Sequence, residues 1–401
     1  MRILKNRLII KVIQNIGLTV LTLIIILSII ELYFKLFSPQ ILNYTTKGML
    51  ILDADCGFRP SSNFTGVQSH PEYVVNIKTN SLGLRNKEIE LSKKQNEFRI
   101  VVLGDSFTFG YGVEGDQTYV YFLNEFLKKY SPFNSSNSNM NVEKINCGVG
   151  AYGTKKEIKF YEKYCRELNP DLVILGFYVG NDLFDNSEID PMTISDGLLI
   201  KTRSLDDYQK EKNKIFSLNL FLNRFHITHF IKNRISGYEE KKVIIPVEEW
   251  YKNQFYHRLS LLLTNSLQSV SKEMEDTLNL LKAFDKSLKS RGVRFVVLLI
   301  PFKEQVINLR QEKVKEAILK KTYHLKEEDF DFFLPQKRLK DYFKKNAIPV
   351  CDVAPGFVKS RQNRNLYYKE DDHWTVDGHK LTAEILHRFL LRNSTIFNQS
   401  Q

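Results

Sequence analysis

The sequence is poor in cysteine, and its few cysteines are widely spaced. Cys56, Cys147, Cys165 and Cys351 form no CxxC pair, which excludes the usual zinc-binding and dithiol redox patterns. An extracytoplasmic location would permit a disulfide, so a disulfide and buried free thiols both stay open as states of these residues.

The sequence also lacks clustered basic residues, although its overall charge is basic. Lys and Arg number 58 against 46 Asp and Glu, which gives a net charge of +12. No run of these cations is interleaved with aromatic residues or glycine in the manner of a nucleic-acid module. The charge therefore favours a negatively charged surface or a glycan as partner, and no nucleic acid. With 43% hydrophobic residues, the 401-residue chain can form a large core, in one large domain or two small ones.

Long apolar runs are absent except at the N-terminus. One extends from Val12 to Ile30 and approaches the roughly 20 residues that a spanning helix needs. Four cations precede it: Arg2, Lys5, Arg7 and Lys11. This bias favours a cytoplasmic N-terminus, so we expect residues 1–37 to be a cytoplasmic stub and single-pass anchor in the inner membrane, with the rest outside. The alternative is a cleaved signal peptide, but residues 31–35 offer no small-residue cleavage site.

Short apolar runs alternate with helical stretches between residues 99 and 392. The expected strands are 99–103, 142–145, 171–178, 293–299 and 349–353. The expected helices are 118–130, 155–168, 275–289, 313–346 and 375–391. This alternation predicts one α/β domain with a parallel sheet flanked by helices.

Two segments break the alternation. Residues 38–98 are expected to be a tether followed by an edge element with a strand at 73–77. Residues 183–273 carry charged and amphipathic stretches and are expected to form an insertion or lid. Their apolar part, 216–231, fits an added helix packed on the core or a segment that lies on a membrane or over a groove.

Reactive side chains follow the strands of the expected sheet. Ser106 follows the first strand, the glycine-rich segment 148–153 the second and Asn181 the third, while His373 precedes the last helix. Ligands of parallel sheets bind at these carboxyl ends. Acyl transfer needs a nucleophile, a base, an acid that orients the base, and donors for the oxyanion. Ser106 supplies a hydroxyl and His373 a base, and the Ser106 amide, an amide of the 150–151 turn and the Asn181 side chain are candidate donors.

Four motifs in this order resemble the conserved blocks of the SGNH (GDSL-like) hydrolase superfamily. They are GDSFTFG at 104–110, NCGVGAYG at 146–153, GND at 180–182 and HWTVDGH at 373–379. The resemblance implies a flavodoxin-like three-layer α/β fold. It also implies an acyl-serine intermediate on Ser106, His373 as the base, and neither a metal nor another cofactor.

The second block departs from the family pattern. Where the family usually has its oxyanion glycine, this chain has Ala151, with Gly150 just before it. A backbone amide can serve from either residue. Alanine carries a conformational penalty if the position needs a positive φ, so Gly150 and Ala151 both stay candidates.

The acid that orients His373 is the second departure. The commonest family spacing, D-x-x-H, would select Glu370, whereas D-x-H-W would select Asp371. We prefer Asp371 because Trp374 completes the second pattern, which resembles polysaccharide O-acetyltransferases similar to the alginate-modifying enzymes. Asp372 is the least favoured, since side chains of adjacent residues diverge. His379 falls inside the last helix, where a packing or capping role is expected.

The resemblance implies a serine esterase acting on O-acyl groups, with O-acetyl preferred, of an extracytoplasmic glycan or envelope polymer. The first alternative is a polysaccharide O-acetyltransferase that uses the same residues, for which a membrane protein supplying the acyl group becomes a further partner. The second is a glycan-binding domain without catalysis. It is least favoured because Ser106, Asn181 and His373 are all present.

Overall fold

The computed structural model describes most of the chain. The described residues are 2–37, 46–70, 72–129, 140–183, 192–195, 198–201, 225–228, 230–231, 258, 260–264, 268–307, 329–369 and 371–397. Their contacts divide the chain into two units. The first comprises Met1–Tyr44, Ser69–Pro71 and Arg203–Val243, and the second comprises Thr45–Gln68, Glu72–Thr202 and Ile244–Gln401.

The first unit contains the long N-terminal helix α1 (Arg2–Phe37). Its stretch Ile10–Phe37 is long and apolar enough to cross a membrane. Large apolar side chains along it are exposed, Leu18 and Ile29 among them. A helix with apolar residues on all sides needs an apolar environment, which fits a membrane anchor or a signal sequence.

The end of α1 contacts part of the apolar stretch 216–231. The Glu31 carboxylate accepts hydrogen bonds from the backbone N–H groups of His226 and Ile227, at 2.8 and 3.0 Å. Capping of backbone N–H groups by a carboxylate satisfies donors that have no helical partner. Most of the stretch lies outside the described residues, so its expected placement stays a prediction.

The second unit is built on a five-stranded parallel sheet in the order β11-β10-β7-β5-β6. Its strands are β5 (Glu97–Gly104), β6 (Asn141–Gly148), β7 (Leu172–Tyr178), β10 (Arg294–Ile300) and β11 (Val350–Asp352). All five expected strands are present, and their order is that of flavodoxin-like sheets, so the predicted fold class is confirmed. In such sheets ligands bind at the carboxyl ends of the strands where the order reverses, here β5 and β7.

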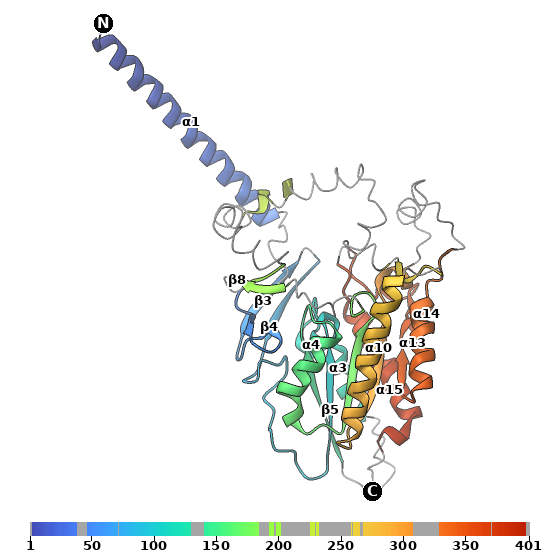
Figure 1. Cartoon of the computed structure of the whole chain (residues 1–401). Coiled ribbons are helices and arrows are strands. Elements are labelled where there is room, and N and C mark those ends of the chain that lie inside the picture. The colour runs from blue at the N-terminus through green and yellow to red at the C-terminus, as the bar shows by residue number, and fades with distance from the viewer. Residues whose placement is uncertain are drawn as a thin grey trace. The chain divides into compact units, whose positions relative to one another are not determined.

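Helices cover both faces of this sheet (Figure 1). They are α3 (Tyr119–Lys129), α4 (Thr154–Phe160), α10 (Gln268–Lys289), α13 (Leu334–Lys345), α14 (Ala354–Ser360) and α15 (Val376–Arg392). Helices α3, α14 and α15 pack together, and α4 packs with α10. The result is the three-layer arrangement that the resemblance implied.

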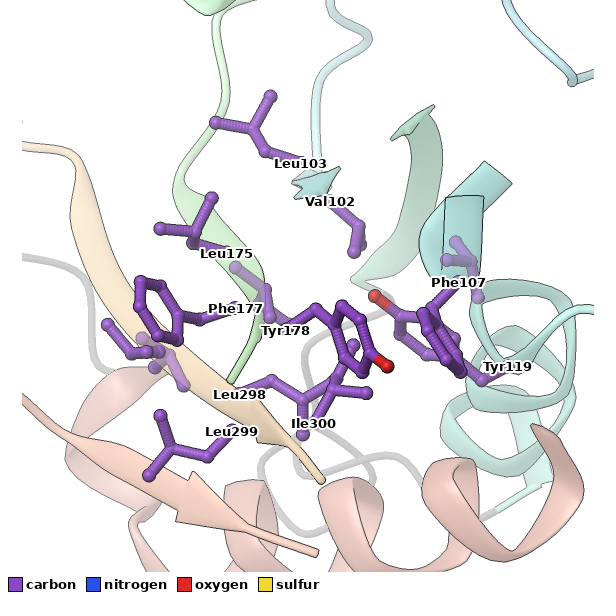
Figure 2. Close-up of a cluster of buried hydrophobic side chains, with 14 of the residues drawn as sticks. Val102, Leu103, Phe107, Tyr119, Leu175, Phe177, Tyr178, Leu298, Leu299 and Ile300 are labelled. Carbon is purple, nitrogen blue, oxygen red and sulfur yellow. The ribbon is translucent and has the colours of Figure 1, made fainter. Parts of the chain in front are cut away.

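The middle strands are buried along their whole length. Every residue of β5 and β7 is buried, as is typical of a parallel sheet covered on both faces. Figure 2 shows Val102, Leu175 and Leu298 from three neighbouring strands in one apolar cluster. Burial of each such side chain contributes about 1.5–3 kcal/mol to the stability of the fold. The strands whose ends carry the reactive residues are therefore firmly packed in the core.

Two expected helices differ in detail. The stretch 155–168 is not one continuous α-helix, because α4 passes into a π-helical turn at Tyr161–Cys165 and then a 3-10 turn. The stretch 313–346 ends in α13, which has Pro335 in its first turn. Proline is tolerated there because N–H groups of the first turn have no partner within the helix. The earlier half of that stretch lies outside the described residues.

The lead-in segment 38–98 is more than a tether. It forms two small sheets from β1 (Leu50–Asp53), β2 (Gly57–Pro60), β3 (Thr65–His70) and β4 (Tyr73–Lys78). The expected strand at 73–77 is β4, but β4 pairs with β3 and does not extend the central sheet. Phe58 and Ile77 are buried in the same core as the large sheet, which explains why most of the segment belongs to the second unit.

The predicted insertion is described only in part. It contributes β8 (Met192–Ser195) and β9 (Leu198–Lys201), which pair antiparallel. Near its end, Leu261 and Leu262 are buried in the core. The rest of a lid over residues 183–273 falls largely outside the described residues.

Candidate active site

Ser106 lies directly after β5, at the start of the short helix α2 (Ser106–Phe109). The Asp105 carboxylate accepts a hydrogen bond of 2.9 Å from the second backbone N–H of this helix, so it caps the helix that begins at the serine. Gly104 has a φ of 150°, and a Cβ there would collide with Thr108 Oγ1. Only glycine fits this turn, and the turn places Ser106 at the carboxyl end of the sheet.

His373 and Asp371 lie on the loop before α15. His373 Nε2 is 2.7 Å from Ser106 Oγ, and His373 Nδ1 is 2.6 Å from Asp371 Oδ1. The same carboxylate oxygen accepts the backbone N–H of His373 at 3.0 Å. Trp374, fully buried, anchors the loop in the core. The structure thus brings together the three side chains expected to act as nucleophile, base and orienting acid.

The hydrogen bonds assign the protons of this array. With Nδ1–H donating to Asp371, Nε2 of His373 is left to accept the Ser106 hydroxyl proton. Burial acts to raise the pKa of Asp371, but the hydrogen bond and charge of His373, with a further hydrogen bond from Tyr73, hold it well below its usual range. Burial acts to lower the pKa of His373, but the hydrogen bond and charge of Asp371 outweigh burial and raise it.

The neighbouring acids have other placements. Asp372 Oδ2 accepts a hydrogen bond from Arg258 Nη1 at 2.6 Å, so its carboxylate pairs with that cation and not with His373. Glu370 lies outside the described residues. The choice of Asp371 over Glu370 as orienting acid therefore has a hydrogen bond in its favour, and its catalytic role is taken up as a proposal below.

His379 is buried away from the serine. Its Nδ1 accepts the backbone N–H of Tyr119 at 3.2 Å, and its ring stacks on the Tyr119 ring with centroids 6.1 Å apart. Burial lowers the pKa of His379 to about 3, with the Arg85 charge adding to the effect. A neutral imidazole that packs inside the domain matches the packing role expected for it.

The turn after β6 takes an unusual backbone conformation at one residue. Ala151 has a φ of 63°, the left-handed region that costs a residue with a Cβ about 1–2 kcal/mol. Gly150, just before it, does not take a positive φ. The left-handed conformation is therefore held by Ala151 and not by Gly150, and the choice between their two N–H groups as oxyanion donor stays a prediction.

Asn181 lies in the turn after β7, at the same edge of the sheet as Ser106. The turn is closed by Asp182, whose Oδ2 accepts the backbone N–H of Tyr178 at 2.7 Å, while the Asn181 backbone N–H donates to the Tyr178 carbonyl at 3.3 Å. The third block thus forms a tight turn at this edge of the sheet. The role of the Asn181 side chain as an oxyanion donor stays a prediction.

Two residues at the site, Glu72 and Tyr73, were not predicted from the sequence. Tyr73 Oη donates to Asp371 Oδ2 at 2.5 Å, and the Glu72 carboxylate accepts the backbone N–H groups of Lys369 and Asp371 at 2.6 and 2.9 Å. Both come from the lead-in segment. The alternation of β4 marks Tyr73 as buried, but nothing local shows which buried residue faces Asp371.

The four cysteines and the possible metal ligands of the described residues bear on the states left open by the sequence. All four cysteines are free and buried, so free thiols are the state found among the two left open. Within the described ranges, no group of three or more His, Cys, Asp and Glu side chains is arranged to hold a metal ion.

The C-terminal part of the chain matches a known protein family. Residues 261–401 match the family described as "SGNH hydrolase-like domain, acetyltransferase AlgX". The matched stretch includes Asp371 and His373, while Ser106, Ala151 and Asn181 lie before it. No curated protein matches the chain at a significant level.

Several solved structures are similar to the chain at low identity. An acetyl xylan esterase from Geobacillus stearothermophilus is 11% identical, with 73% of this chain and 94% of that chain covered and a TM-score of 0.36. A GDSL-like lipase from Bacteroides thetaiotaomicron is 12% identical, with 76% and 93% covered and a TM-score of 0.36. A two-domain esterase active on acetylated mannans is 14% identical, with 76% and 51% covered and a TM-score of 0.37. With TM-scores below 0.5, these likenesses carry no weight for the reaction or substrate of this chain.

Proposed function

Because residues 261–401 match an SGNH hydrolase-like family whose description names an acetyltransferase, we propose that the chain is an SGNH-type serine esterase acting on O-acetyl groups of an extracytoplasmic glycan. The observation that carries the proposal is the continuous array from Ser106 Oγ through His373 to Asp371, with contacts of 2.7 and 2.6 Å. These distances lie within the reach that proton transfer between nucleophile and base requires.

In the proposed reaction, His373 Nε2 takes the Ser106 hydroxyl proton as Oγ attacks the acetyl carbonyl carbon. The resulting oxyanion accepts hydrogen bonds from the Ser106 and Ala151 backbone N–H groups and the Asn181 amide. His373 then gives the proton to the leaving sugar oxygen, which leaves acetyl-Ser106. Water attacks this ester while His373 takes its proton, and acetate and free serine result. Asp371 holds the imidazole in the tautomer that both steps need.

The choice of an extracytoplasmic glycan rests on topology and charge. The apolar helix Ile10–Phe37 has cations before it, which favours a cytoplasmic N-terminus and an outward-facing catalytic domain. An enzyme anchored in this way acts on polymers within reach of the membrane face. Fractionation should find the full-length protein in the inner membrane with a C-terminal tag open to external protease. A mature N-terminus near residues 30–40 would instead mean a cleaved signal.

A second candidate is O-acetyl transfer, which the family match favours because its description names an acetyltransferase. The acetyl-Ser106 intermediate would be the same. A sugar hydroxyl would then replace water as the group that attacks it, and a membrane partner would supply the acetyl group.

One set of assays tests the proposal. The purified protein should release 4-nitrophenol from 4-nitrophenyl acetate, remove acetate from acetylated oligosaccharides, and be labelled on Ser106 by a fluorophosphonate. Ser106→Ala should lose labelling and nearly all activity, while Ser290→Ala, at an exposed position, should lose neither. If sugar acceptors yield acetylated sugar and acetylated glycans are left intact, transfer is the reaction. Binding of glycans with no turnover and no labelling would leave only a binding domain.

A further inference from the structure

Tyr111 lies between the proposed base and the oxyanion turn, and the proposed reaction so far gives it no role. It follows Ser106 by five positions, and its backbone N–H donates to the Ser106 carbonyl at 3.0 Å. Its ring contacts the His373 ring, with centroids 5.3 Å apart. Tyr111 is therefore held at its backbone by the hydrogen bond to Ser106 and at its ring by the contact with the His373 imidazole.

The hydroxyl of Tyr111 reaches the turn that carries the expected oxyanion donors. A Cβ on Gly150 would collide with Tyr111 Oη and would lie 2.6 Å from Cζ. The hydroxyl thus occupies the space that a side chain at position 150 would fill. It is beside the peptide that joins Gly150 to Ala151, whose N–H is a proposed oxyanion donor.

This contact explains which residue of the turn is glycine. Ala151 takes the positive φ, where glycine would be the less strained choice, and Gly150 does not. Backbone conformation alone would favour the opposite order. Position 150 needs glycine because the Tyr111 hydroxyl occupies the space where a Cβ would lie.

Tyr111 is suited to donate a hydrogen bond. Its side chain is buried, with 7% exposed, and among the described residues no group is hydrogen-bonded to Oη. Burial raises the pKa of Tyr111 well above its ordinary value, with the Asp105 charge adding to the effect, so the phenol is neutral and keeps its proton at any working pH. A neutral donor at this edge with no partner in the described protein is free to hydrogen-bond an oxygen of the substrate.

We propose that Tyr111 Oη donates a hydrogen bond to the acyl oxygen of the substrate, as a further oxyanion donor beside Ala151. The phenol stays protonated throughout, so no proton leaves it and no bond to it forms. This role rests on the proposed acyl-serine reaction. It makes Tyr111 a catalytic residue that acts in both acylation and deacylation, since the same oxygen bears the negative charge in each step.

The test is Tyr111→Phe, which keeps the ring on His373 and removes only the hydroxyl. The expected result is a loss of about 10- to 100-fold in kcat with KM little changed, somewhat less than is typical for removal of one oxyanion donor. The loss should be equal for 4-nitrophenyl acetate and for an acetylated sugar, because both carry the same acyl oxygen. The acid limb of the pH profile should not move, because His373 keeps its neighbours.

Tyr178→Phe is the matched control. The Tyr178 ring lies 4.5 Å from Phe107, whose ring also contacts His373, and Figure 2 shows Tyr178 and Phe107 side by side. Its hydroxyl is unpaired among the described residues but is also sealed from solvent, so no substrate oxygen can reach it, and its removal should leave kcat within about twofold.

Three outcomes would overturn the assignment to the acyl oxygen. The first is full activity of Tyr111→Phe in an enzyme whose wild-type form labels at Ser106. The second is a loss confined to the sugar ester, which would place the hydroxyl at the alcohol side. The third is a shifted acid limb, which would mean that Tyr111 acts through His373. If the wild-type protein neither labels nor turns over, the acyl-serine reaction itself fails, and that result is distinct from all three.

Discussion

Tyr73 and Asp371 are 298 positions apart, yet the Tyr73 hydroxyl donates to Asp371 Oδ2 at 2.5 Å, and both residues are buried. The other carboxylate oxygen accepts two hydrogen bonds from His373. A buried carboxylate needs such donors to stay ionised. The lead-in segment therefore completes the support of the proposed orienting acid.

Tyr73→Phe should reduce activity without abolishing it. Removing a buried donor to a charged group costs about 1–3 kcal/mol of stability. With one donor fewer, the Asp371 charge acts more strongly on His373, so the acid limb of kcat/KM should move to higher pH. Tyr164→Phe is the control, because Tyr164 donates to Asp53 in a similar pair. It should lower the melting temperature without moving the limb, and an unmoved limb in Tyr73→Phe would contradict the positioning role.

The wild-type enzyme should lose activity in acid at a pH above the ordinary histidine value. His373 must be neutral to accept the serine proton, and its pKa is raised from 6.5. The midpoint of the acid limb on 4-nitrophenyl acetate should therefore lie above 6.5. His373→Ala should have no measurable turnover, whereas His379→Ala should keep turnover if it folds. A midpoint clearly below 6.5 would show that the Asp371 contact does not control the base.

The hydrogen-bonded pair of His373 and Asp371 should stabilise the fold most at acidic pH, where the enzyme is inactive. A raised folded pKa of His373 adds stability below its unfolded pKa, near 6.5, and that stability is lost as pH rises through the folded pKa. A lowered folded pKa of Asp371 adds stability above its unfolded value, near 3.9, that is lost as pH falls. The contribution is greatest between roughly pH 4 and 6.5, and chemical denaturation should show it shrinking in Asp371→Asn.

Among the three acids before His373, Asp371 should matter most for rate. Asp371→Asn removes the acceptor that fixes the imidazole tautomer, and kcat should fall by about 10³-fold or more, as is typical when a triad acid is lost. Asp372→Asn and Glu370→Gln should each stay within about 10-fold, since Asp372 pairs with Arg258. A larger loss in Glu370→Gln would show that the wrong family spacing was preferred.

The backbone strain at Ala151 can be tested by glycine. Ala151→Gly removes a left-handed penalty of about 1–2 kcal/mol and adds an unfolded-state entropy cost of about 0.5–1 kcal/mol, so it should stabilise the fold by up to about 1.5 kcal/mol. Ala347 has a similar φ of 53° away from the site, and Ala347→Gly should stabilise equally. Activity should persist in both, because the amide of residue 151 keeps its direction. Destabilisation at position 151 alone would mean that the alanine methyl has a packing role.

Local patterns were enough to predict the sheet and the placement of its reactive residues. Apolar runs gave all five central strands, and the motif order placed Ser106 and Asn181 at adjacent strand ends. The D-x-H-W spacing selected Asp371, whose hydrogen bond to His373 the structure contains. These features depend on residues close in sequence or on the geometry common to parallel sheets.

Contacts between distant segments could not be predicted in this way. The pairing of β4 with β3 and the hydrogen bond from Tyr73 to Asp371 depend on how the lead-in segment packs against the finished domain. The positive φ of Ala151 could not be predicted either. Alanine gives no sign of this conformation in the sequence, and Gly150 beside it is the residue type that usually adopts it. The need for glycine at position 150 depends on Tyr111. This residue follows the first motif, and its side chain fills the space where a Cβ at position 150 would lie.

Arg258 links the end of the predicted insertion to the loop that carries the base. Its Nη1 lies 2.6 Å from Asp372 and 3.9 Å from Glu304, and its guanidinium is 5.6 Å from the Tyr178 ring centroid. Asp372 is the residue next to His373 in sequence. We therefore expect this contact to let the insertion affect the access of water to the proposed acetyl-Ser106.

Arg258→Met should change the products more than the chemistry. The substitution keeps the apolar stem and removes the cation, so the insertion loses its ion pair to Asp372, and the end of the site admits water more freely. With an oligosaccharide acceptor present, the ratio of acetate to acetylated sugar should rise by a few fold, while 4-nitrophenol release stays within about threefold. Arg291→Met is the control, since Arg291 pairs with Glu162 at 2.7 Å on an exposed surface. An unchanged product ratio in Arg258→Met, with transfer detectable in the wild type, would show that this arm of the insertion does not govern how the acyl-enzyme is resolved.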